Sequence, residues 1–83
     1  MKTYNYTPHG VCSTNIEFSL DEEGLIHDLK YTGGCNGNLK AIGRLVEGKP
    51  AAEIAEILRG NLCHNRGTSC ADQLSKAIDE ALA

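Results

Sequence analysis

The chain has 83 residues, enough for one domain with a modest hydrophobic core and too few for two. Its hydrophobic content of 41% and charged content of 23% are ordinary for a globular domain and argue against disorder. The formal net charge is -3 and the Lys and Arg residues are scattered, so we expect no contact with nucleic acid or with anionic lipid. The sequence therefore predicts a single domain over residues 1–83.

Alternation of apolar and polar residues predicts three β-strands, at residues 3–7, 11–20 and 25–32. The apolar face of the second strand is formed by Ile16, Phe18 and Leu20. Cys12 has the same parity, so we expect its side chain on the packed side of the sheet. The corresponding face of the third strand carries Leu25, Leu29 and Tyr31.

Helical spacing of apolar residues predicts three helices, at residues 38–46, 51–58 and 70–82. Ser69 can cap the last helix, with Asp72 completing a pair that resembles a capping box. The order of these elements predicts an α+β fold, in which a three-stranded antiparallel sheet is followed by three helices packed on one face.

The cysteines at positions 12, 35, 63 and 70 are the most informative residues. The first residues contain no apolar stretch of signal-peptide length, and no run is long enough to span a bilayer, so we expect a cytoplasmic protein. In that compartment four cysteines indicate metal binding or redox chemistry rather than two disulfides. Two disulfides remain the alternative for an exported protein, and ordinary buried cysteines are a further one.

Cys35 and Cys70 stand at the predicted N-termini of helices, where the partial positive charge favours the thiolate that binds metals. The neighbouring glycines, Gly33, Gly34 and Gly37, allow close approach of the backbone to a sulfur atom. No Cys-x-x-Cys knuckle is present, so convergence of the cysteines has to come from the fold.

Three histidines are alternative ligands, and we rank all of them below the cysteines. His64, adjacent to Cys63, is the best of the three. His27 is expected to be a partly buried strand residue and His9 a solvated one. No constellation typical of nucleophilic catalysis is present, so we do not expect catalysis by this chain alone.

The run Thr68-Ser69-Cys70-Ala71-Asp72 resembles the motif that names the TSCPD domain family, with Ala71 where that motif has proline. The family consists of small four-cysteine proteins, and the domain also occurs at the C-terminus of adenosylcobalamin-dependent ribonucleotide reductases. The resemblance implies a module that binds zinc or an iron–sulfur cluster. It also implies an accessory role to a redox enzyme such as ribonucleotide reductase, so that any activity would be related to ribonucleoside-diphosphate reduction.

Residues 24–35 and 69–78 are similar to segments of U-type (NifU-like) iron–sulfur scaffold proteins. On this resemblance Cys12, Cys35 and Cys70 match the three cluster-binding cysteines of the scaffold, which implies a similar fold. The chain departs from that pattern where Ser13-Thr14 follows the first cysteine in place of Gly-Asp, and where Ser69 stands in place of a histidine.

Cys63 is a fourth thiol that the U-type scaffolds lack. Four thiolates complete a tetrahedral set, which favours a structural zinc or a stably held cluster over a transfer scaffold. We therefore expect Cys12, Cys35, Cys63 and Cys70 to surround one metal centre. An iron–sulfur scaffold or carrier is the alternative function. A thiol–disulfide protein that uses Cys63 and Cys70 is a second one, against which their wide spacing argues.

Overall fold

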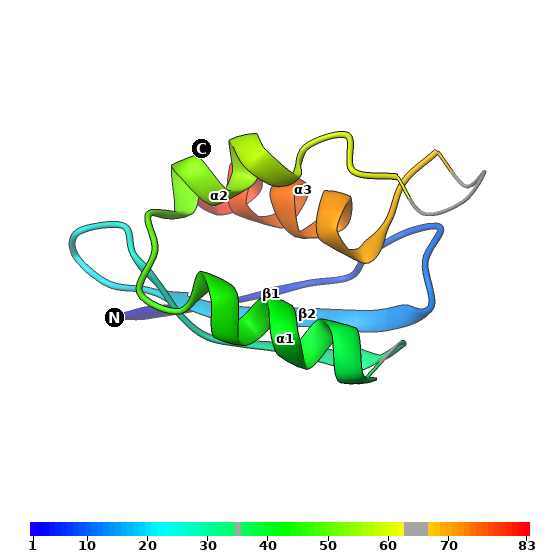
Figure 1. Cartoon of the computed structure of the whole chain (residues 1–83). Coiled ribbons are helices and arrows are strands. Elements are labelled where there is room, and N and C mark those ends of the chain that lie inside the picture. The colour runs from blue at the N-terminus through cyan, green and yellow to red at the C-terminus, as the bar shows by residue number, and fades with distance from the viewer. Residues whose placement is uncertain (35, 63–66) are drawn as a thin grey trace.

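The computed structural model describes residues 1–34, 36–62 and 67–83. The elements follow in the order β1 (Lys2–Tyr6), β2 (Ser13–Leu20), β3 (Ile26–Gly33), α1 (Asn36–Val46), α2 (Ala51–Leu58) and α3 (Cys70–Leu82). In the described ranges the strands form one antiparallel sheet in the order β1-β2-β3. Helices α2 and α3 lie above the sheet and α1 runs beside β3 (Figure 1). The predicted α+β fold, a three-stranded antiparallel sheet followed by three helices, is confirmed.

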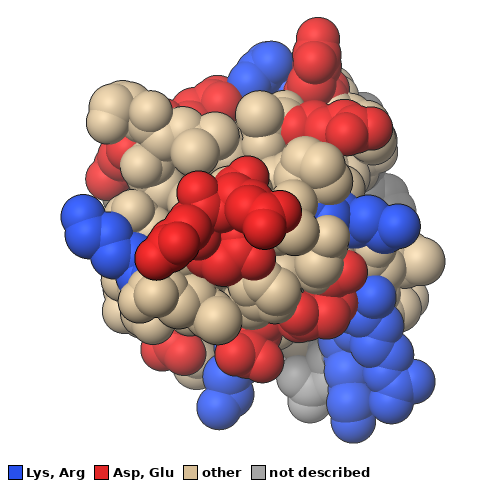
Figure 2. Space-filling view, turned by 90° about the vertical axis from the view of Figure 1, so that its left-hand side faces the viewer, with Lys and Arg blue, Asp and Glu red and all other residues tan. Residues whose placement is uncertain are grey.

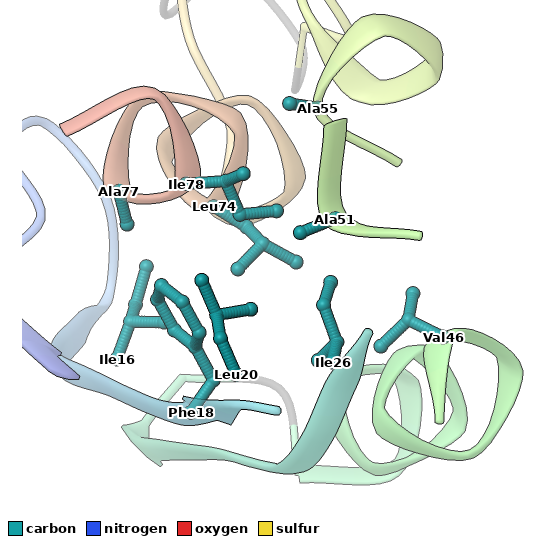
Figure 3. Packing of buried hydrophobic residues seen from close by; sticks show 10 residues of the cluster. All are labelled: Ile16, Phe18, Leu20, Ile26, Val46, Ala51, Ala55, Leu74, Ala77 and Ile78. Carbon is teal, nitrogen blue, oxygen red and sulfur yellow. The ribbon is translucent and has the colours of Figure 1, made fainter. Parts of the chain in front are cut away.

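The hydrophobic core lies between the sheet and α3. Ile16, Phe18 and Leu20 point from β2 toward Leu74 and Ile78 on α3 (Figure 3). Small side chains on α2 allow this helix to pack closely beside α3. Within the described ranges, no helix is long and apolar enough to cross a bilayer.

Two β-bulges in the β2–β3 ladder decide which side chains face this core. Between Ser13 and Asn15 the chain advances two residues in β2 but only one in β3, so the extra residue is in β2. Between Glu17 and Ser19 the extra residue is in β3, beside Asp28, whose φ of 55° is unusual for a residue other than glycine. Each extra residue reverses the inward and outward alternation beyond it.

The two bulges correct two assignments made from strand parity. Cys12, expected on the packed side with Ile16, lies just before β2 and is exposed, whereas Ser13 is only 3% exposed. In the third strand Ile26 is fully buried and Leu25, predicted to share the inner face, is only partly buried. Simple alternation was wrong at both places because it ignores the extra residue.

A pair of glycines carries the chain from β3 toward α1. Gly33 and Gly34 have φ values of 77° and 82°, which side chains other than glycine rarely adopt. A Cβ added at Gly34 would lie 2.9 Å from Cδ1 of Leu39 and 3.5 Å from Cβ of Ser13. At Gly33 the added atom would lie 3.4 Å from the backbone oxygen of Cys12. The glycine pair therefore passes directly against the start of β2.

Replacing Gly34 with alanine tests this close approach. Gly34→Ala should lower the free energy of unfolding by at least about 1 kcal/mol, because alanine is strained in the left-handed conformation and its Cβ would collide with Leu39. Gly37→Ala is the matched control, since nothing lies within 4 Å of an added Cβ in that position of α1. Urea unfolding of both variants makes the comparison. A Gly34→Ala variant as stable as wild type would contradict the described approach.

Candidate functional site

Two of the four predicted metal ligands lie in the part of the chain that the structure describes. Cys12 directly precedes β2 and is exposed, and Cys70 is the first residue of α3 and is partly buried. Cys35, Cys63 and the alternative ligand His64 lie outside the described residues. Within residues 1–34, 36–62 and 67–83, no group of three or more His, Cys, Asp or Glu side chains is placed to hold a metal ion. The predicted four-cysteine centre stays a prediction.

Cys70 contacts both of the neighbouring strands β2 and β3. Its Sγ lies 3.2 Å from Oγ of Ser13, the first residue of β2. The hydroxyl of Tyr31, on β3, donates a hydrogen bond of 2.8 Å to the backbone oxygen of Cys70. Burial and, to a smaller extent, the negative charge of a Cys70 thiolate raise the pKa of Tyr31, so its hydroxyl keeps the proton that it donates. Side chain and backbone of Cys70 thus each have a fixed contact with the sheet.

The N-terminus of α3 is capped as the sequence predicts. Oγ of Ser69 accepts a hydrogen bond of 3.0 Å from the backbone N–H of Asp72, and its hydroxyl donates to the backbone oxygen of Asn61. Cys70 is therefore the first residue of the helix, directly after the cap.

The side chain of Asp72 makes contacts that the sequence did not predict. Its carboxylate accepts hydrogen bonds from the hydroxyl of Thr68 at 2.6 Å and from the backbone N–H of Gly60 at 2.8 Å. Nε2 of Gln73 donates to Oγ1 of Thr68 at 2.9 Å. The hydrogen bonds from Thr68 and Gly60 lower the pKa of Asp72 despite its burial, and that from Thr68 has the larger effect. A buried polar network thus joins the end of α2 to the start of α3.

Sequence reasoning missed Ser13, Tyr31, Thr68 and Gln73 as residues of this site. The polar run that precedes Leu74 was a usable signal for Thr68 and Gln73, since buried polar groups need partners. No local signal could have identified Ser13, because it lies 57 residues from Cys70 in the chain.

His27 lies away from Cys70, at the end of the molecule with the β2–β3 turn. Its Nδ1 is 2.7 Å from Oε2 of Glu47 and its Nε2 is 2.7 Å from Oδ2 of Asp21. Both carboxylates accept hydrogen bonds from the imidazole ring, and these bonds raise the pKa of His27, that with Asp21 more than that with Glu47. Figure 2 shows acidic side chains gathered on this end. His27 is the partly buried strand histidine expected from the sequence.

His9, the remaining described histidine, is exposed. Its backbone N–H donates a hydrogen bond of 3.0 Å to Oε1 of Gln73, which links the segment before β2 to α3. The expectation of a solvated residue agrees with this exposure.

Removing the charge of Asp72 tests the network. Asp72→Asn should lower the free energy of unfolding near neutral pH by about 1–3 kcal/mol, the range for losing hydrogen bonds to a buried charged group. Because the folded-state pKa is below the ordinary value of 3.8, the contribution is complete above that value and is lost as the pH falls through the folded-state pKa. Denaturant unfolding at neutral pH and below pH 3.8 should show the difference between the two proteins shrinking in acid.

Asp79→Asn is the control for this prediction. Asp79 pairs with Arg59 at 2.8 Å on the surface, where such a pair contributes about 0–1 kcal/mol. An Asp72→Asn effect no larger than that of Asp79→Asn would show that the network does not stabilise the start of α3.

The sequence matches the family model described as TSCPD domain over residues 1–82. No curated protein and no solved structure gives a significant match to the chain. The matched region includes all four cysteines and the run from Thr68 to Asp72 that forms the cap and the buried network. The chain belongs to the TSCPD domain family.

Proposed function

We propose that this chain is a small metal-binding module in which Cys12, Cys35, Cys63 and Cys70 together hold one zinc ion or one iron–sulfur cluster. One observation carries the proposal: three segments that bear cysteines meet at Ser13. Cys12 precedes Ser13 in the chain, and Cys70 lies within hydrogen-bond distance of its hydroxyl. Gly34 directly precedes Cys35, and a Cβ added at Gly34 would lie 3.5 Å from Cβ of Ser13.

The chemistry of the described donors fits a metal bound by thiolates. Cys70 lies at the N-terminus of α3, and the Ser13 hydroxyl is in place to donate a hydrogen bond to a metal-bound thiolate. Cys12 is exposed and directly precedes Ser13 in the chain. Thiolate ligands suit both zinc and iron–sulfur clusters, and a bound metal would supply folding free energy that a core of this size benefits from.

We further propose that the module accompanies a redox enzyme such as a ribonucleotide reductase and does not catalyse a reaction alone. The support for this partner is membership in the TSCPD domain family. The metal would then hold the module in the shape that the partner binds.

A second candidate, an iron–sulfur scaffold or carrier, is favoured by the accessibility of the cysteines. Cys12 is exposed and Cys70 is partly exposed, so both described cysteines lie at least partly at the surface. Transfer of a cluster to a recipient protein needs ligands near the surface. The two candidates differ in how long the metal stays bound.

Substitution of Cys63 tests the four-thiolate site. With a structural metal, Cys63→Ser should lower both the metal affinity and the melting temperature of the holoprotein, because metal-binding energy is also folding energy. The loss of affinity should exceed the roughly 10–100-fold that follows loss of an outer-shell partner. Protein purified without air, metal analysis, visible absorption and chelator competition provide the measurements. His64→Ala is the control and should retain the metal.

Four outcomes would argue against this proposal. Unchanged metal content and melting temperature in Cys63→Ser would contradict a site with four thiolate ligands. A coloured cluster that passes rapidly to an apo-ferredoxin would favour the carrier. Wild-type protein that takes up neither zinc nor a cluster under reducing conditions would overturn both readings, and loss of a disulfide reductase activity in Cys63→Ser would favour the thiol–disulfide alternative.

A further inference from the structure

We infer that Ser13 is a positioning residue of the proposed metal site. Its hydroxyl donates a hydrogen bond to the Cys70 thiolate and thereby reduces the electron donation from that sulfur to the metal. The inference rests on the proposed function, and it concerns a residue that is not itself a ligand.

The direction of the hydrogen bond follows from the groups involved. Oγ of Ser13 and Sγ of Cys70 are 3.2 Å apart, and either can donate while the cysteine is a thiol. Metal binding requires the thiolate, which has no proton. In the metal-bound form the serine hydroxyl is therefore the donor and the sulfur the acceptor.

The surrounding structure fixes this hydroxyl in place. Ser13 is 3% exposed and pairs with Gly33 at the start of the β2–β3 ladder. The bulge between Ser13 and Asn15 turns it toward α3, and Gly34 packs beside it, since an added Cβ there would lie 3.5 Å from Cβ of Ser13. The acceptor is positioned as well, because the hydroxyl of Tyr31 donates a hydrogen bond to the backbone oxygen of Cys70. Donor and acceptor are thus both positioned before any metal binds.

A hydrogen bond to a metal-bound thiolate has a predictable electronic effect. It lowers the energy of the sulfur lone pairs, so promotion of an electron from sulfur to the metal requires more energy. Outer-shell hydrogen bonds of this kind also orient the ligand and contribute to metal affinity. In an iron–sulfur cluster the same contact would raise the reduction potential.

Cobalt(II) is a suitable probe because its thiolate complexes have charge-transfer absorption. We expect the full chain with Ser13→Ala to bind Co²⁺ with the sulfur-to-cobalt band shifted to lower energy and with an affinity about tenfold weaker. Ser13→Thr retains a hydroxyl and should retain the wild-type band. Ser19→Ala is the matched control, since Ser19 is a buried serine of the same strand whose hydroxyl contacts Thr3 instead. It should change neither the band nor the affinity.

The possible results separate this inference from the proposed function. Wild-type protein that forms no thiolate complex with Co²⁺ would overturn both. Binding by wild type with an identical band in Ser13→Ala would overturn the role of Ser13 alone, as would an equal shift in Ser19→Ala. A folded Ser13→Thr with the spectrum of Ser13→Ala would do the same. If Ser13→Thr does not fold, the comparison of Ser13→Ala with Ser19→Ala decides.

Discussion

The carboxylate of Asp72 is the contact on which the geometry of the site depends. It accepts from the backbone of Gly60 after α2 and from Thr68 before α3, so the two helices are held at their adjoining ends. The cap by Ser69 then determines where α3 begins. These contacts together place Cys70 over the first residue of β2. The buried polar residues at this end of α3 therefore help to fix the position of the helix, together with the apolar residues, such as Leu74, that follow them.

The helices of this fold could be predicted from the sequence and the inward faces of its strands could not. A helical stripe repeats over several turns, so α2 and α3 have the predicted limits. Strand parity fails after a single extra residue, and the β2–β3 ladder contains two such irregularities. A positive φ at Asp28 is compatible with aspartate but is not specified by it, and nothing in the sequence marks the irregularity after Ser13.

The candidate site divides in the same way between local and distant information. The environment of Cys70 within its helix is local, and the motif around it indicated both the Ser69 cap and the position of Cys70 at the start of α3. Its contacts with Ser13 and Tyr31 span 57 and 39 residues and require the completed sheet. The two carboxylates on His27, 6 and 20 residues away, are a further example. Residue identity thus predicted the cap at the start of α3, whereas the completed fold determines which distant residues contact Cys70.

Alanine at position 71 affects where the last helix begins. Proline disfavours the helical conformation in the residue before it, and it is itself most frequent as the first residue of a helix. A proline at position 71 would therefore disfavour the helical conformation at residue 70. Ala71 imposes no such restriction, and α3 accordingly begins at Cys70, directly after the Ser69 cap. Alanine at this position thus permits a helix whose first residue is the cysteine itself.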